Sequence, residues 1–150
     1  SSDELMNIPT GSFDAVTMWH VLEHVHDLHG TIEKIRDIMM KTGVLIVAVP
    51  NYTSYDAAAY QQYWAAYDVP RHLYHFSPLS IRLLMDKHGL VVNKIKPMWF
   101  DSFYVSLLSE QYRNGKQNLV GGFMHGLKSN LKAVGNRQKA SSLIYIIRKK

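Results

Sequence analysis

The stretch Phe13-Asp14-Ala15-Val16-Thr17-Met18-Trp19-His20-Val21-Leu22-Glu23-His24 decides the fold of this chain, because a strand-like run ends there in titratable side chains. Residues 16–19 are β-branched, sulfur-containing and aromatic types that favour a buried strand. His20, Glu23 and His24 then follow at spacings that would share one helical face. Ligands of open α/β sheets bind at the carboxyl ends of strands, so this polar turn is the expected functional site.

The residues after the turn predict a helix and then a second strand. Asp27 suits the N-cap of a helix that ends near Gly43, and the residues between them carry apolar side chains at helical spacing: Ile32, Ile35, Ile38 and Met39. Val44–Val49 is an unbroken apolar run, which is typical of a parallel strand buried on both faces. Strand, helix and strand in this order predict a right-handed βαβ unit.

The rest of the chain predicts two more strands, further helices and one long aromatic connection. Ser77 before Pro78 marks the start of a helix, and Gly89 marks its end. We expect strands at Leu90–Pro97 and Ser142–Arg148, helices within 99–113 and 119–134, and a loop at 3–12. Long connections with their own composition are often functional, so residues 50–76 are interpreted as a lid. The pattern as a whole predicts a layered α/β fold.

Length and composition match one globular domain, with 150 residues of which 47% are hydrophobic. No apolar run is long enough to cross a bilayer, and the polar residues 1–4 lack the features of a signal peptide. The chain has no cysteine, which excludes disulfide bonds and thiolate metal sites. We therefore expect a cytoplasmic protein.

The net charge of +5 is unevenly distributed along the chain. Residues 1–110 contain 8 basic and 12 acidic side chains, whereas residues 111–150 contain 9 basic and no acidic ones. Such a segment could bind nucleic acid or an anionic membrane, which is an alternative function. The lysines are scattered among leucine, valine and glycine, so we favour a solvated basic face and expect neither nucleic acid nor a membrane as a partner.

The turn after Trp19 allows three interpretations. His20-x-x-Glu23-His24 has the H-x-x-E-H spacing of inverted zinc proteases, but no long helix contains it and no third ligand stands out. A structural role also remains open, in which His24 caps the turn and His20 satisfies backbone groups. We favour a ligand-facing role, in which His20 and Glu23 position or deprotonate a substrate hydroxyl.

Residues 68–76 form a second cluster of polar and aromatic side chains. Arg71 offers a planar fork for a carboxylate or phosphate, and His72 titrates near neutrality. Pairing of Arg71 with Asp68 inside the chain is equally open.

Three segments, residues 11–25, 41–51 and 68–78, together resemble the C-terminal part of a class I S-adenosylmethionine-dependent methyltransferase. They are similar to the group that includes the ubiquinone-biosynthesis O-methyltransferases. The resemblance implies a partial Rossmann-like sheet with the family's strands in the order 4-5-7-6, an antiparallel seventh strand, and helices on its faces. It also implies methyl transfer from S-adenosylmethionine to a small-molecule acceptor.

The resemblance implies three sets of site residues: catalytic His20, Glu23 and His24; cofactor-binding Asp3, Met18, Trp19 and His20; and substrate-binding Arg71 and His72. In the ubiquinone enzymes the turn reads Glu-x-x-Glu-His and is associated with a divalent metal. His20 replaces the first of these glutamates here, exchanging a hard oxygen donor for an imidazole, so we expect no metal at this site.

The chain also departs from this family. Strands 1–3 of the family, with their glycine-rich turn and the acidic residue after the second strand, have no counterpart, and Gly121-Gly122 follow no apolar strand. We therefore expect residues 1–150 to be the C-terminal portion of one methyltransferase domain, with a helical basic insert at 98–141, and to be inactive alone. The exposed edge of strand 13–19 could self-associate, which makes a non-catalytic interaction module another alternative.

Overall fold

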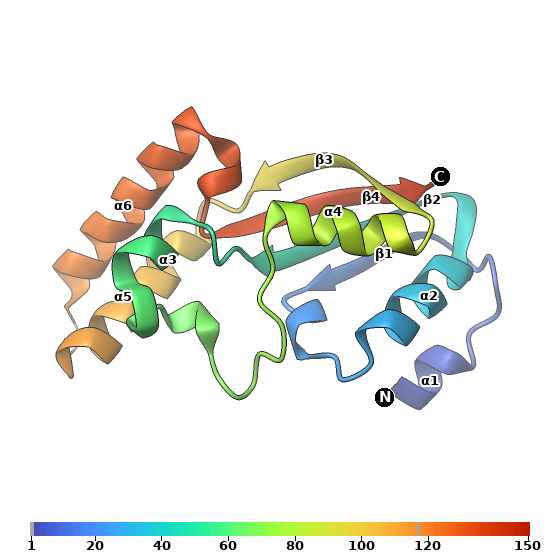
Figure 1. The fold of residues 1–150 in the computed structure, drawn as a ribbon, viewed down its shortest axis with the longest axis horizontal. Coiled ribbons are helices and arrows are strands. Elements are labelled where there is room, and N and C mark those ends of the chain that lie inside the picture. Colours follow the sequence, from blue (N-terminus) through green and yellow to red (C-terminus); the bar gives the residue numbers. More distant parts are fainter. Residues whose placement is uncertain (1, 117) are drawn as a thin grey trace.

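A computed structural model describes residues 2–116 and 118–150, and a four-stranded sheet forms its centre (Figure 1). Its strands are β1 (Phe13–Trp19), β2 (Met39–Pro50), β3 (Leu90–Pro97) and β4 (Ser142–Lys149), in the spatial order β1-β2-β4-β3. β1 and β2 pair in parallel, while β4 runs antiparallel to both of its neighbours. The predicted α/β class and the order 4-5-7-6 with an antiparallel last strand are confirmed.

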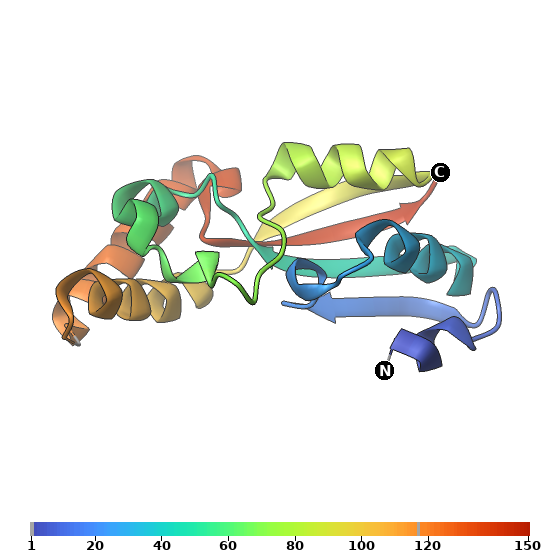
Figure 2. The same cartoon turned by 60° about the horizontal axis from the view of Figure 1, so that its bottom comes forward.

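Two helices, α2 (Leu28–Ile38) and α4 (Pro78–Lys87), cover one face of this sheet (Figures 1 and 2). Sheet residues on that face, among them Val47 and Tyr145, form the main core with apolar side chains of both helices. Several positions of β2 and β4 on the other face are only partly buried: Val44, Ile46, Ile144 and Ile146. No described helix is long and apolar enough to cross a membrane.

A helical lobe lies beyond the carboxyl ends of β1 and β2 (Figure 1). It contains α3 (Tyr55–Tyr60), α5 (Asp101–Asn114) and α6 (Leu119–Gly135), with short 3₁₀ turns at Gln61–Tyr63, Ala65–Tyr67 and Arg137–Lys139. The 50–76 connection and the segment 98–141 therefore form one body. A second, smaller apolar core unites them around Tyr60, Trp64 and Val105.

The carboxylate of Asp56 joins three parts of this lobe and is 1% exposed. It accepts hydrogen bonds from Trp64 Nε1 at 2.9 Å, from Ser129 Oγ of α6 at 3.0 Å, and from Ser141 Oγ beside β4 at 2.6 Å. A buried charge is tolerated only when it is paired or hydrogen-bonded. This network therefore fixes the lobe against the end of the sheet.

The helix starts were predicted better than some of the ends. Asp27 caps α2 by accepting from the Gly30 amide, and Ser77 forms a capping box before Pro78. Two expectations were wrong: residues 2–6 form a short helix, α1 (Ser2–Met6), instead of a loop, and α2 ends at Ile38 instead of near Gly43. Gly43 lies within β2, where a Cβ would sit 3.1 Å from the Phe13 carbonyl oxygen, so this glycine permits close strand approach.

We predict that Asp56→Ala destabilises the chain, because it leaves three buried donors without an acceptor. Each such orphaned donor costs about 1 kcal/mol or more, so the free energy of unfolding should fall by about 3 kcal/mol. Urea denaturation measures this change, and Asp14→Ala on the exposed surface of β1 is the matched control. Equal losses in the two variants would show that the network contributes nothing.

Candidate active site

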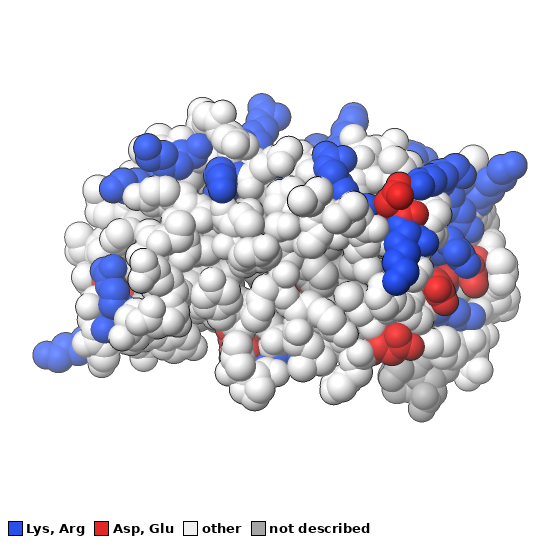
Figure 3. All heavy atoms as spheres, in the orientation of Figure 1, with Lys and Arg blue, Asp and Glu red and all other residues white. Residues whose placement is uncertain are grey.

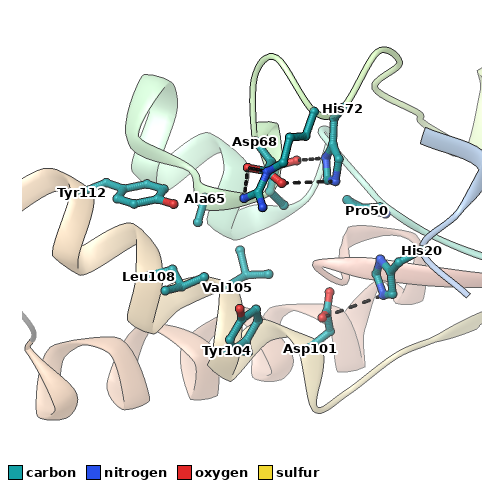
Figure 4. A pocket seen from close by; sticks show the side chains of 12 residues that line it. His20, Pro50, Ala65, Asp68, His72, Asp101, Tyr104, Val105, Leu108 and Tyr112 are labelled. Atoms are coloured by element: carbon teal, nitrogen blue, oxygen red, sulfur yellow. Dashed lines mark hydrogen bonds and ion pairs between the residues drawn. The ribbon is translucent and has the colours of Figure 1, made fainter. Parts of the chain in front are cut away.

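A cavity of about 230 Å³ lies between the 50–76 connection, α5 and the ends of β1 and β2 (Figure 4). Its walls combine apolar residues with a few polar groups: Pro50, Ala65, Ala66, Val105, Leu108, Tyr104, Tyr112, His20, Asp68, Arg71, His72 and Asp101. An apolar cavity with a few convergent polar groups is the usual form of a small-molecule site. It is located where the sequence predicted the functional turn.

His20 is the residue that brings the end of β1 into this cavity. Its amide N–H donates to the Ala48 carbonyl oxygen at 2.9 Å, and its φ of 53° turns the chain away from the strand direction. The ring Nδ1 donates to Glu23 Oε1 at 3.2 Å, while Nε2 lies 4.0 Å from Asp101 Oδ1. His20 Nε2 is buried and has no hydrogen-bond partner among the described residues, so it is available to a ligand.

The two carboxylates beside His20 favour its protonated form. The hydrogen bond to buried Glu23 raises the pKa of His20, and the charge of Asp101 adds to this effect. Burial raises the pKa of Asp101, which accepts a hydrogen bond from Ser142 Oγ. An imidazole with a raised pKa between two carboxyl groups is a better proton acceptor than a free one, which suits general-base chemistry.

Glu23 and His24 lie in a 3₁₀ turn, Leu22–His24, rather than in a regular helix. The amides of Leu73 and Tyr74 donate to the Glu23 carbonyl oxygen at 2.8 and 3.3 Å, so this turn holds the 50–76 connection in place. The protease interpretation fails here, because H-x-x-E-H chemistry needs one long helix through the motif.

Donor atoms of Glu23, His24 and His72 lie within 4.8 Å of one another. The Nδ1 atoms of both histidines are engaged by the carbonyl oxygens of Arg71 (3.0 Å) and Ala66 (2.9 Å), and His72 Nε2 lies 3.8 Å from Asp68 Oδ2. Two imidazoles and one carboxylate are a donor set that suits zinc better than magnesium. His20 does not belong to this set, since it turns toward Asp101.

The predicted substrate residues Arg71 and His72 both line the cavity. Arg71 donates from Nη2 and Nε to Asp68 Oδ1, at 2.6 and 3.0 Å, so the pairing left open by the sequence is present. Arg71 is nevertheless 73% exposed and can reorient toward a ligand. Burial lowers the pKa of His72, which favours a neutral ring near pH 7.

The predicted cofactor residues are less closely grouped. Trp19 is half exposed at the end of β1, next to His20. Met18 is 6% exposed and its side chain packs in the main core. Only the backbone of Met18 is therefore available beside Trp19. Asp3 lies in α1, and its side chain is outside the described part of the structure.

Asp101 and Ser142 are site residues that the sequence analysis missed. Asp101 is 81 positions from His20 in the chain and reaches it only because α5 begins beside the first residue of β4, Ser142. One signal was present: after Asp86 the chain has only two acidic residues, Asp101 and Glu110. An isolated carboxylate in a basic, apolar segment is a candidate for burial and function.

Comparison with known proteins identifies the relatives of this chain. A family model described as a methyltransferase domain matches residues 2–95. A search of curated proteins finds no match.

Several solved structures share the fold at low sequence identity. Mitomycin 7-O-methyltransferase aligns at 18% identity and a TM-score of 0.58, over 97% of this chain and 32% of that one. A possible histamine N-methyltransferase of Thermotoga maritima aligns at 16% identity and a TM-score of 0.59, over 96% and 59%. The [4+2]-cyclase SpnF aligns at 12% identity and a TM-score of 0.58, over 95% and 52%. The chain thus spans between a third and three fifths of the length of these structures.

We predict that Glu23→Gln lowers the pKa of His20, because the hydrogen bond to an ionised carboxylate is the largest cause of its rise. NMR titration of the histidine rings in the presence of a chelator measures this. Folding raises this pKa, so the stabilisation is complete below about pH 6.5 and disappears as the pH rises through the folded-state value. An unchanged His20 titration in Glu23→Gln would contradict the assignment, and His26, which no described carboxylate contacts, is the internal control.

Proposed function

The chain belongs to the methyltransferase domain family, and on this basis we propose that it takes part in S-adenosylmethionine-dependent methyl transfer to a small-molecule acceptor. The observation that carries the proposal is His20, which faces an apolar cavity at the strand ends with Glu23 and Asp101 on either side. The fold alone does not fix the reaction, since the cyclase SpnF shares it. The proton-accepting group in the cavity is what favours transfer to an oxygen or nitrogen.

When bound, S-adenosylmethionine supplies an electrophilic methyl group on a positively charged sulfur. An acceptor oxygen or nitrogen that took this methyl group would have to lose a proton. His20 Nε2 takes this proton, because no residue in the described part of the chain hydrogen-bonds to it. Glu23 and Asp101 stabilise the resulting imidazolium by charge. Alignment of the acceptor by the cavity walls supplies much of the remaining rate.

The remaining predicted residues have positioning roles in this proposal. The 50–76 connection acts as a lid over the acceptor, with Arg71 and His72 at its inner side. Trp19 and the neighbouring backbone of Met18 form one wall of the methyl-donor site, and Asp3 stays a predicted cofactor residue. The apolar residues that line the cavity suit an acceptor with an apolar body: Ala65, Ala66, Val105 and Leu108.

The residues present fit only part of an S-adenosylmethionine site. β1 is an edge strand with Phe13 and Trp19 exposed, and the paired residues behind β2 and β4 are partly exposed. The sequence contains no glycine-rich turn after a strand, which in this fold cradles the methionine end of the cofactor. We infer that the chain supplies one wall and the lid, and that another segment or subunit pairs with β1 to supply the opposite wall.

A second candidate is a non-catalytic module that self-associates through β1. The exposed edge of this strand favours it, because unpaired backbone groups of an edge strand bind other strands readily. Both candidates use the same edge, and they differ in whether pairing creates a cofactor site.

We predict that His20→Gln lowers methyl transfer by about 10²–10⁴-fold, as expected for loss of a general base. The assay transfers radiolabelled methyl groups to candidate acceptors, with the chain combined with the partner or segment that completes the site. The control His26→Gln, at an exposed position outside the cavity, should stay fully active. Full activity of His20→Gln would refute the assigned role.

We also predict that the 150-residue chain alone binds S-adenosylmethionine with a dissociation constant weaker than about 1 mM, because most of the cradle is missing. Calorimetric titration measures the constant, and sedimentation of the same sample shows whether the chain is a monomer. A micromolar dissociation constant for a monomer would disprove the inference that one wall of the cofactor site is missing. If the chain self-associates, if Thr17→Lys abolishes this association, and if the chain binds no cofactor, the results would support the non-catalytic module instead.

A further inference from the structure

α6 has its small residues inside and its large apolar residues outside. Gly122 and Gly126 face α5 so closely that an added Cβ would lie 2.8 Å from Leu107 Cα and 2.9 Å from Phe103 Cα. The outer face carries side chains that are 55 to 76% exposed: Leu119, Val120, Phe123, Met124, Leu131 and Val134. A helix on a water-exposed surface normally has the opposite arrangement, with its apolar stripe toward the core.

The neighbouring helix extends this apolar face. Phe103 of α5 stacks on Phe123 of α6 with ring centroids 5.2 Å apart, and a groove between the helices is lined by apolar side chains alone. Phe100, just before α5, is 87% exposed. Small residues between helices and large apolar residues outside are the arrangement of helices that contact lipid. We call this surface, formed by Phe100 and the outer residues of α5 and α6, the hairpin face.

The charges beside the hairpin face are positive. Lys128 of α6 lies beside Met124 and Leu131 of the apolar stripe, with its Nζ 5.7 Å from the centroid of the Tyr55 ring. Lys132 follows one turn later, and Lys116, Arg137 and Lys139 lie near the ends of the helix. The two acidic residues of the hairpin are not surface charges, because Asp101 lines the cavity and Glu110 is 1% exposed and bonded to Tyr60 and Arg113. In Figure 3, Lys and Arg lie at both ends of the molecule, whereas most of the visible Asp and Glu lie toward the end away from α6.

We propose that the hairpin face docks on the surface of a bilayer that contains anionic phospholipids. α6 lies in the plane of the interface, with Val120, Phe123 and Met124 in the acyl boundary and its lysines at the head groups. A helix with an apolar face, flanking lysines and no surface carboxylate has the composition of interfacial helices. The two contributions are complementary: the apolar side chains insert into the acyl boundary, while the lysines favour negatively charged lipids.

A second copy of the chain fits this face less well. A two-fold contact would bring Lys128 and Lys132 of both copies together without any carboxylate to pair them. Nucleic acid would use the lysines but would leave the exposed leucine, valine and phenylalanine side chains against a charged backbone. The bilayer is the partner that uses both features.

The hairpin face also continues into the candidate active site. Tyr104 and Leu108 line the cavity that contains His20, and they also line the adjoining groove with Leu107 and Leu119. Docking would therefore place that cavity beside the lipid surface. The docking proposal goes beyond methyl transfer and does not depend on it.

The test is vesicle co-sedimentation of the full chain with phosphatidylcholine vesicles, with and without phosphatidylglycerol. We expect binding only to the anionic vesicles, weakened by salt. The double variant Val120→Ser/Phe123→Ser should bind at least about tenfold more weakly, because two interfacial side chains are lost. The matched control Leu79→Ser/Leu83→Ser removes side chains of α4 that are 66 and 63% exposed and should bind normally.

A charge variant tests the second contribution. Lys128→Gln/Lys132→Gln should weaken binding roughly tenfold or more, whereas Lys87→Gln/Lys94→Gln at exposed positions elsewhere should have little effect. Thermal unfolding of every variant checks that the fold is kept. The proposal is overturned by no binding to anionic vesicles, by equal losses in the paired controls, by tighter binding to duplex DNA than to vesicles, or by a lipid-free dimer that Val120→Ser/Phe123→Ser dissociates.

Discussion

The parallel pairing of β1 with β2 is the constraint on which the rest of this structure depends. It runs in register from Ala15 opposite Val44 to Trp19 opposite Ala48, and the His20 amide adds one more bond to Ala48. Parallel strands end at the same edge of a sheet, so this register brings the turn after β1 and the end of β2 together. The turn then holds the 50–76 connection through the Glu23 carbonyl oxygen. The turn after β1, the end of β2 and the 50–76 connection therefore meet, and together with α5 they enclose the cavity.

The same sheet leaves two surfaces that its own helices do not use. α2 and α4 both lie on one face (Figure 2), so residues of the other face such as Ile46 and Ile146 stay partly exposed. β1 is the last strand in the sheet order, so its outer edge is unpaired. A doubly wound sheet normally has helices on both faces, since its strands are apolar on both sides. The apolar run Val44–Val49 has this two-sided composition. That composition is the physical basis for proposing that a further segment or subunit completes the sheet.

The sequence predicted the elements of the sheet and the position of the site, because both follow from local patterns. Continuous apolar runs identified β1 and β2, and Ser77-Pro78 identified the start of α4. The contact between His20 and Asp101, which completes the site, could not be found from local patterns. Asp101 approaches His20 only because α5 begins where β3 ends and β4 begins. Such a contact depends on the packing of the lobe and on no local periodicity. The resemblance to methyltransferases supplied the strand order, which apolar patterning alone leaves undetermined.

The sidedness of α6 shows a second limit of sequence patterns. Its residues alternate between a small face, with Gly122, Gly126 and Ala133, and a large apolar face. Periodicity reveals that two such faces exist, but it does not say which one is buried, and the usual rule would bury the large one. Contact with α5 decides the matter, because the backbone of α5 at Leu107 and Phe103 lies too close for any side chain larger than hydrogen at the two glycines. Once the glycines are inside, phenylalanine, valine and leucine must face outward with lysines along their border. The lysines that the sequence analysis assigned to a solvated face are exposed, and Lys128 lies beside the outward apolar side chains.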